Sequence, residues 1–596
     1  MFILKIENAK MEFDGVTLFE QASLEIQENE RVALIGENGV GKTTFLKGIL
    51  GQIPMKEGKI TFGISRDEIG WMMQDSDGDV CLSTREWVES EHLELSQLKR
   101  ELLKSQEEKR LDDYNQTLQK YLDMDGYQWE VQVEKTLNQL GLLEPVWELP
   151  FSSLSGGQKT RAKLARVMIK SPKLLILDEP TNHLDTETIE WLQDWLSRYR
   201  GSVLFISHER DFIDQMAQMT YELTEKGMKK YQGGYQAYKT QKDHEMKSLQ
   251  SLYEKQRQER KKLIDTIQMY KNWYQQANAA ASVRNPVAQK QAAKQATKYK
   301  TKEKELERLE NERVEKPQET PSIQASFDAK DFSGKRMLDV NQVSFSYGTH
   351  LVLREVNMQI KRGDRLAVIG KNGSGKTTLL KLMAGKLMPT SGVITRNPQL
   401  NIGYFFQELE NLHPERTILE ELLSLPNITQ SEARTILACF LFRKEEVYKK
   451  VKQLSMGEKC RVAFVKLYFS GANLLILDEP TNYLDIATRE RIEEMLVAYQ
   501  GAVVVVAHDP YLLRKITNKV AMIGNGKVSN YIGTYEEWEQ HVSISPQSQE
   551  IRNKQQRLEW ELAELLSEEG VEAEEQRLEK AKELKQQLEQ LKSMEE

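Results

Sequence analysis

The stretch GENGVGKTT at residues 36–44 decides the fold of this chain, and GKNGSGKTT at residues 370–378 repeats it. Both satisfy the pattern GxxxxGK followed by Ser or Thr, in which glycine-rich backbone wraps nucleotide phosphates at the start of a helix. Each follows an apolar run, RVALI at residues 31–35 and RLAVI at residues 365–369, which supplies the strand that the motif requires. The sequence therefore predicts two α/β units that bind nucleotides.

Each loop supplies residues that we expect to hold the phosphates and the Mg²⁺ ion of a nucleotide. Backbone N–H groups contact the phosphates, the lysine reaches the β- and γ-phosphate oxygens, and the threonine hydroxyl binds Mg²⁺. The expected nucleotide-binding residues are Gly36, Glu37, Asn38, Gly39, Val40, Gly41, Lys42, Thr43 and Thr44 in the first copy, and Gly370, Lys371, Asn372, Gly373, Ser374, Gly375, Lys376, Thr377 and Thr378 in the second.

Three further motifs follow each loop in the same order. They are LSGGQ, LLILDEPTNHLD and ISH at residues 154–158, 174–185 and 206–208, and LSMGE, LLILDEPTNYLD and VAH at residues 454–458, 474–485 and 506–508. The spacing from Asp178 to His208 equals the spacing from Asp478 to His508. The chain is therefore an internal duplication, and the two copies share one fold.

Acidic residues end the LLILD segment, which we expect to be a buried parallel strand. Its last carboxylate lies at the edge where α/β sheets bind ligands, so Asp178 and Asp478 are predicted to help hold Mg²⁺. The adjoining Glu179 and Glu479 are predicted to orient or deprotonate the attacking water. These two glutamates are the candidate catalytic bases.

Histidines and glutamines complete each predicted site. His208 and His508 end apolar strands at the same sheet edge and are predicted to contact the γ-phosphate; a lone histidine is more often structural, but its matching position in both copies favours function. Gln74 and Gln407 follow the short strands IGWMMQ and IGYFFQ, and are predicted to sense Mg²⁺ and the attacking water. For an isolated glutamine, the favoured alternative is a solvent-exposed side chain without such a role. The expected metal ligands are Thr43, Gln74, Asp178, Thr377, Gln407 and Asp478.

LSGGQ and LSMGE, each upstream of LLILDEP, resemble the signature of the ATP-binding cassette superfamily. The resemblance implies Mg²⁺-dependent hydrolysis of ATP to ADP and phosphate, in a head-to-tail sandwich that pairs each P-loop with the signature of the other cassette. It thus implies that Ser455 and Gly457 join the first site, and that Ser155 and Gly157 join the second. A chain with both cassettes forms this sandwich within one monomer.

The superfamily resemblance also assigns residues outside these motifs. The aromatic that stacks on adenine maps onto Phe13 and Tyr347, with an ordinary core aromatic as the alternative. Asp185 and Asp485 match the loop that communicates across the sandwich. The second copy departs from the pattern, with replacements at Met456, Glu458, Tyr483, Ala507 and Pro510. Because the phosphate-binding groups remain, we expect both sites to hydrolyse ATP, at different rates.

The remaining segments are charged and helix-forming, so the fold class is α/β with helical additions. We expect cassette 1 at residues 1–240, with an inserted helical arm at about residues 86–146, and cassette 2 at residues 326–545. A basic linker at residues 241–325 is predicted to be a long helical hairpin that breaks at Pro286, and residues 546–596 are predicted to form a charged C-terminal helical hairpin.

Two cassettes without a membrane domain, an arm in the first cassette and a long linker resemble the ABC-F family of translation factors and ribosome-protection ATPases. The segment YQGGYQAY at residues 231–238 resembles the sequence that leads into the linker of that family. The resemblance implies ribosome binding in the ATP-bound state, with contacts to rRNA and to the acceptor end of the P-site tRNA near the peptidyl-transferase centre. Hydrolysis then releases the protein.

The charge distribution tests this partner independently. The whole chain has a net charge of −7, which argues against a polyanion partner. Residues 260–302, however, hold ten basic residues and one acidic residue, a local charge of +9. The expected RNA-binding residues are Lys290, Lys294, Lys298, Trp273 and Tyr274, whose types suit phosphate contact and base stacking. The alternative is a solvated spacer, which the scarcity of acidic residues disfavours.

Composition restricts the remaining function classes. With three cysteines, no CxxC pair and no apolar run of about 18 residues, the chain is expected to be cytoplasmic, without a disulfide framework or a membrane span. The alternatives are the ATPase subunit of a membrane exporter and a nucleic-acid maintenance ATPase. Within the ABC-F interpretation, the long linker turn favours antibiotic protection or rescue of stalled translation over a housekeeping role.

Overall fold

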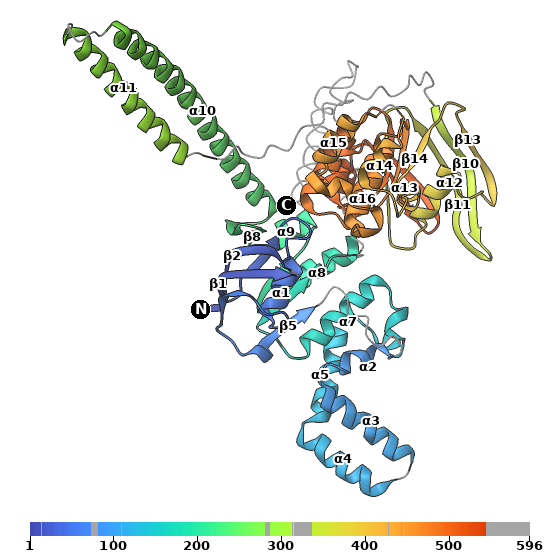
Figure 1. Cartoon of the computed structure of the whole chain (residues 1–596). Coiled ribbons are helices and arrows are strands. Elements are labelled where there is room, and N and C mark those ends of the chain that lie inside the picture. The colour runs from blue at the N-terminus through green and yellow to red at the C-terminus, as the bar shows by residue number, and fades with distance from the viewer. Residues whose placement is uncertain are drawn as a thin grey trace, which may run out of the picture. The chain divides into compact units, whose positions relative to one another are not determined.

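The computed structural model describes residues 1–13, 15–72, 82–108, 110–182, 184, 186–280, 286–312, 314, 336–426, 428–442 and 444–543. They fall into two compact units, each built around its own sheets (Figure 1). The first lies within Met1–Gln324, Thr429–Lys449 and Tyr483–Arg491, and the second within Ala325–Ile428, Lys450–Asn482 and Ile492–Glu596.

A six-stranded sheet forms the nucleotide-binding layer of the first unit, in the order β5-β6-β7-β3-β8-β9. Its strands are β3 (Arg31–Ile35), β5 (Ile69–Met72), β6 (Leu174–Asp178), β7 (Ser202–Ile206), β8 (Met219–Thr224) and β9 (Gly227–Gln232). All neighbours are parallel except β8 and β9. The parallel arrangement brings the carboxyl ends of β3, β6 and β7 to one edge.

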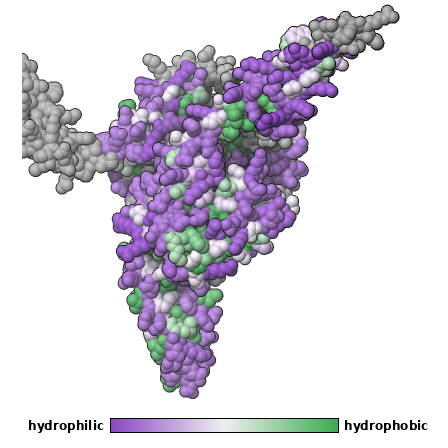
Figure 2. Space-filling view, turned by 90° about the vertical axis from the view of Figure 1, so that its left-hand side faces the viewer, coloured by the Kyte–Doolittle hydropathy of each residue, from purple (hydrophilic) through white to green (hydrophobic). Residues whose placement is uncertain are grey.

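A three-stranded antiparallel sheet, in the order β2-β1-β4, shares a core with this layer. Its strands are β1 (Phe2–Phe13), β2 (Val16–Gln27) and β4 (Glu57–Phe62), and helix α1 (Lys42–Ile49) contributes to the same core. The rings of Phe19 and Phe45 meet edge to face, with centroids 5.6 Å apart. Apolar residues gather in this core, whereas hydrophilic residues cover most of the face shown in Figure 2.

The second unit repeats both sheets. Its parallel layer has the order β14-β15-β16-β12-β17-β18 and its antiparallel sheet the order β11-β10-β13. The strands are β10 (Arg336–Tyr347), β11 (His350–Lys361), β12 (Arg365–Gly370), β13 (Ser391–Arg396), β14 (Ile402–Tyr404), β15 (Leu474–Asp478), β16 (Ala502–Val506), β17 (Lys519–Gly524) and β18 (Lys527–Ile532). The predicted α/β fold of two P-loop cassettes is confirmed.

Helices complete the described parts of both units. Those of the cassettes are α8 (Thr186–Arg198), α9 (Arg210–Met216), α12 (Lys376–Ala384), α13 (Phe405–Glu410), α14 (Ile418–Leu423), α15 (Gln430–Cys439), α16 (Met456–Tyr468), α17 (Ile486–Ala498), α18 (Pro510–Ile516) and α19 (Tyr535–Ser543). Single 3-10 turns are η1 (Arg66–Glu68), η2 (Phe151–Ser153), η3 (Lys444–Tyr448) and η4 (Val451–Gln453). None of the described helices has an apolar stretch long enough to cross a bilayer.

The arm segment of the first cassette is helical. Its helices are α2 (Thr84–Glu89), α3 (Leu93–Glu107), α4 (Leu111–Asp123), α5 (Gly126–Gln139) and α6 (Glu144–Trp147), and they lead to α7 (Gly156–Met168). Helix α2 begins at a capping box, in which Ser83 and Glu86 each accept the other's backbone N–H. Paired helices α3 and α4 project from this base in Figure 1.

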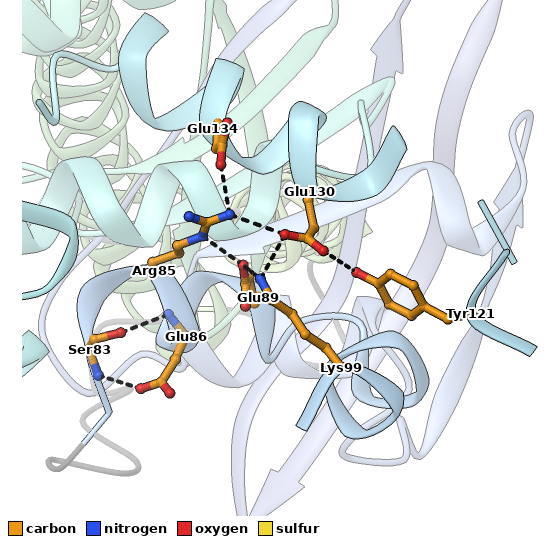
Figure 3. Close-up of polar contacts among 8 residues, drawn as sticks. All are labelled: Ser83, Arg85, Glu86, Glu89, Lys99, Tyr121, Glu130 and Glu134. Carbon is orange, nitrogen blue, oxygen red and sulfur yellow. Dashed lines mark hydrogen bonds and ion pairs between the residues drawn. The ribbon is translucent and has the colours of Figure 1, made fainter. Parts of the chain in front are cut away.

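A polar network joins four helices at the base of the arm (Figure 3). Arg85 of α2 donates to Glu89 at 3.0 Å and to Glu130 of α5 at 3.3 Å. Lys99 of α3 donates to Glu89 at 2.7 Å, and Tyr121 of α4 donates to Glu130 at 2.7 Å. Since Glu89 is only 4% exposed, its two cationic partners offset the cost of burying its charge.

The linker is a helical hairpin, as predicted. It consists of α10 (Tyr235–Ala280), which has 46 residues, and α11 (Pro286–Asn311). The helices are antiparallel, because Arg260 donates to Glu310 near one end and Lys298 lies over the ring of Tyr270 near the other. Pro286 is the first residue of α11, where its missing N–H costs nothing. The predicted C-terminal hairpin lies outside the described residues.

Helix α10 begins inside the first unit rather than at its surface. Tyr235 and Tyr238 are buried, and the Tyr238 hydroxyl donates to Glu222 of β8 at 2.9 Å. The backbone N–H of Gln236 donates to Asp214 of α9 at 2.7 Å. The first turn of the linker is therefore anchored to both a strand and a helix of the cassette.

Candidate nucleotide-hydrolysis sites

The first P-loop connects the end of β3 to the start of α1. A Cβ atom on Gly36 would lie 2.5 Å from the carbonyl oxygen of Leu223, so only glycine fits there, and Gly41 caps the helix with a φ of 96°. The Lys42 ammonium donates to the carbonyl oxygens of Gly36 at 2.8 Å and Glu37 at 3.2 Å. Burial lowers the pKa of Lys42, while neighbouring carboxylates oppose this shift. The loop thus holds a buried cation at the place expected for phosphates.

The second P-loop has the same geometry. The Lys376 ammonium donates to the carbonyl oxygens of Gly370 at 2.7 Å and Lys371 at 3.1 Å. A Cβ atom on Gly370 would lie 2.7 Å from the carbonyl oxygen of Ile523, and Gly375 caps α12 with a φ of 101°. Each predicted phosphate-binding loop therefore adopts the strand–loop–helix form.

The predicted magnesium ligands lie beside these loops. Asp178 and Asp478 end strands β6 and β15, at the edge of each sheet that carries the P-loop. Burial raises the pKa of Asp478, and a hydrogen bond with Thr377 opposes this shift. A hydroxyl and a carboxylate are oxygen ligands of the kind that Mg²⁺ prefers, so this pair fits the ion. Gln74 and Asp185 lie outside the described residues.

Glu179 and His208 meet in the first cassette, as their predicted roles require. Glu179 Oε1 lies 3.1 Å from His208 Nε2, and the backbone N–H of Glu179 donates to the carbonyl oxygen of Ile206. Burial raises the pKa of Glu179 to about 7, and burial lowers the pKa of His208 well below its usual range. Glu179 Oε2 is buried without a hydrogen-bond partner among the described residues. This oxygen can accept a proton from a bound water.

Glu479 and His508 form the corresponding pair in the second cassette, with a different geometry. Glu479 Oε1 lies 3.3 Å from His508 Nε2, and Glu479 Oε2 accepts the backbone N–H of His508 at 3.3 Å. The glutamate side chain is 21% exposed here, compared with 8% for Glu179. The two sites therefore hold the same residue types in different environments.

The signature serines begin helices α7 and α16 through capping boxes. Ser155 accepts the N–H of Gln158, and Gln158 accepts the N–H of Ser155 at 3.0 Å. Ser455 and Glu458 form the same box, so the glutamate that departs from the signature keeps this local role. The signal of Ser followed three residues later by Gln or Glu was visible in the sequence. Gly157 packs against Thr188, whose Oγ1 atom would lie 2.8 Å from an added Cβ.

The remaining candidates are the two aromatic residues expected to stack on adenine and the glutamine of the second site. Phe13 and Tyr347 end β1 and β10 and are 55% and 51% exposed, so neither is an ordinary core aromatic. Gln407 was expected to follow the short strand IGYFFQ; of this segment β14 covers only Ile402–Tyr404, and Gln407 follows it within α13. This strand lies at the edge of the sheet and pairs with β15 over three residues.

Comparisons with known proteins identify relatives of this chain and proteins of similar fold. The family model described as ABC transporter matches residues 19–182 and 353–482. The putative ATP-binding protein YdiF of Bacillus subtilis is 34% identical over 90% of this chain and 82% of its own length. ABC transporter F family member 5 of Arabidopsis thaliana is 31% identical over 89% and 76%. A structure of archaeal ribosome recycling factor aABCE1, with the stalk protein aP1, has a TM-score of 0.57 at 18% identity over 90% of this chain and 92% of its own, and supports the tandem-cassette fold.

Proposed function

This chain belongs to the ABC-F family of ATP-binding-cassette proteins, and we propose that it hydrolyses ATP in both cassettes to control its binding to the ribosome. The observation that carries the proposal is the glutamate–histidine contact beside each P-loop, at 3.1 Å and 3.3 Å. A base at the end of a buried strand and a lysine over a phosphate loop are the groups that phosphoryl transfer to water requires.

The positions of the side chains support hydrolysis in the first site. Lys42 and the loop N–H groups bind the outer phosphates, and Glu179 Oε2 accepts a proton from the attacking water. The His208 ring holds the other carboxylate oxygen and so orients this base. Mg²⁺ held by Thr43 and Asp178 would neutralise charge on the phosphates. In the second site we assign the corresponding roles to Lys376, Thr377, Asp478, Glu479 and His508, although Glu479 Oε2 there accepts the backbone N–H of His508.

The charge of the linker supports a ribosomal partner. The acidic residues of α11 lie toward the end that faces the cassette, where Glu310 pairs with Arg260. Lys290, Lys294 and Lys298 lie on the far half of the hairpin and are exposed, and Trp273 there is 43% exposed. Positive charge interleaved with aromatic rings suits single-stranded or looped RNA.

The proposed cycle places this basic end near the peptidyl-transferase centre. ATP-bound cassettes bind the ribosome with the hairpin directed at the acceptor end of the P-site tRNA, and hydrolysis releases the protein. The name of the structural neighbour aABCE1, a ribosome recycling factor, is consistent with a ribosomal role for tandem cassettes. The outcome we propose is relief of stalled translation or protection from antibiotics that act at this centre.

Sedimentation with ribosomes tests the proposal. The double variant Glu179→Gln, Glu479→Gln should retain ATP binding without hydrolysis, so it should pellet with ribosomes in the presence of ATP. The same variant with ADP is the matched control and should remain in the supernatant. Equal pelleting with both nucleotides, or ATP-dependent pelleting with membranes instead, would contradict the proposal. Growth with peptidyl-transferase drugs, with and without expression, then tests the antibiotic role.

A further inference from the structure

A buried pair of hydroxyls links the two catalytic loops of the first site. Ser207 precedes His208, and its Oγ lies 3.1 Å from Oγ1 of Thr181, which follows Glu179 by two residues. The two side chains are 1% and 4% exposed, so solvent does not compete for this hydrogen bond. Ser207 Oγ also accepts the backbone N–H of Glu209 at 3.0 Å. His208 is therefore flanked by two hydrogen bonds to one hydroxyl.

The second site lacks this hydroxyl. Position 507 is alanine, buried like Ser207, although the corresponding Thr481 is retained and buried. The loop after position 507 is held by another contact. Asp509 caps α18 by accepting the N–H groups of Tyr511 and Leu512. In the first site the helix-capping side chain of Glu209 makes no such bond.

The glutamates of the two sites also differ in their hydrogen bonds. Both oxygens of Glu479 are engaged by His508, one by the ring and the other by the backbone N–H. Glu179 contacts the His208 ring through Oε1, and its Oε2 has no hydrogen-bond partner among the described residues. A base whose second oxygen is already bound must break that bond before it can accept a proton from water.

We propose that Ser207 is a positioning residue of the first site, which holds His208 through its bond to Thr181 so that Glu179 keeps one oxygen for the attacking water. This role rests on the proposed ATPase function and adds a cause for unequal rates. Alanine fills nearly the same space at position 507, so positions 207 and 507 differ in hydrogen bonding rather than in packing. The first site is accordingly the faster one.

Removal of either hydroxyl tests the pair. In a Glu479→Gln protein, which isolates the first site, Ser207→Ala and the isosteric Thr181→Val should each lower the single-turnover rate constant about fivefold. The half-saturating ATP concentration should change less than about twofold. The double variant should be no slower than either single variant, because both remove one shared bond. Thr181→Ser, which keeps the hydroxyl, should restore the rate.

The reciprocal substitution tests the same idea by gain of function. In a Glu179→Gln protein, which isolates the second site, Ala507→Ser should raise the single-turnover rate constant about two- to fivefold. Thr481→Val, introduced with it, should abolish the gain. This arm remains decisive if Ser207→Ala fails to fold, since it adds one atom at a position that holds serine in the other cassette.

The outcomes separate this role from the function on which it rests. Absence of hydrolysis in both isolating backgrounds would overturn the proposed ATPase and this role together. Hydrolysis that Ser207→Ala and Ala507→Ser both leave unchanged would overturn the positioning role alone. Additive losses in Ser207→Ala and Thr181→Val would also overturn it, because independent effects cannot come from one bond.

Discussion

Lys298 of α11 places its ammonium 5.6 Å from the centre of the Tyr270 ring on α10. This cation–π contact lies across the basic half of the linker hairpin, where the two helices carry mostly positive charge. Lys298 therefore supports the hairpin while it remains exposed to a partner. Lys294 and Lys290, about one and two helical turns earlier, are also exposed.

Neutralisation of this basic half should weaken ribosome binding. The variant Lys290→Gln, Lys294→Gln, Lys298→Gln should reduce the steepness of log affinity against log salt by roughly two to three. The reason is that binding with three fewer phosphate contacts releases fewer counterions. Binding at several salt concentrations measures this slope. A matched variant with Lys361, Lys386 and Lys527 changed to Gln should behave as wild type. An unchanged slope would restore the interpretation of the linker as a spacer.

Capping of α16 predicts the effect of changes at Glu458. Glu458→Ala removes one half of the capping box and should lower the free energy of unfolding by about 0.5–1 kcal/mol. Glu458→Gln keeps the box and should leave stability unchanged. Urea denaturation of both variants provides the comparison. Equal stability of the Ala and Gln variants would show that the box contributes nothing.

The arm network predicts a pH-dependent contribution from Glu130. Burial alone would raise its pKa, but hydrogen bonds from Tyr121 and Lys99 hold the pKa of Glu130 below its usual range. The charged form is thus favoured in the folded state, and its contribution is present above the unfolded pKa and lost as the pH falls through the folded pKa. Wild type should exceed Glu130→Gln in urea midpoint at pH 7, and the difference should shrink toward pH 4. A constant difference would contradict this assignment.

Two cysteines should react slowly with thiol reagents. Cys439 and Cys460 are 2% and 3% exposed, and burial raises the pKa of Cys460 to about 11. Burial also raises the pKa of the Cys439 thiol, so the thiolate, which is the reactive species, is disfavoured in both. With the third cysteine of the chain, Cys81, changed to serine, the protein should therefore incorporate little label in its native state and two equivalents in guanidinium. Rapid native labelling would indicate that the α15 or α16 region opens readily.

Local patterns made most of the fold predictable. The P-loops, the LLILD strands and the linker hairpin each depend on residues close together in sequence, and all three are found in the structure. The short strand expected before Gln407 is found, but it ends at Tyr404, at the edge of the sheet, where β14 pairs with β15 alone. Edge pairing is a tertiary property that an apolar run alone does not reveal.

Part of each candidate site was likewise predictable from the sequence, and part depends on tertiary packing. That Glu179 and His208 share an edge follows from parallel strand order, which the duplicated motifs implied. The bond between Ser207 and Thr181 could not be predicted, because it depends on how two loops 26 residues apart in sequence pack side by side. The capping role of Ser155 and Gln158 was predictable from their spacing, but the signature motif drew attention to the nucleotide instead.

Because Tyr235 and Tyr238 are buried, the first turn of α10 is fixed in the cassette core, and the rest of the helix extends from this anchored turn. A helix of 46 residues is about 70 Å long at 1.5 Å per residue. Rotation of its first turn by about 5° therefore moves the far end by about 6 Å, roughly the length of one helical turn. The backbone N–H of Gln236 donates to Asp214 of α9, which begins two residues after His208. A small shift of α9 would therefore produce a much larger displacement at the basic end of the hairpin.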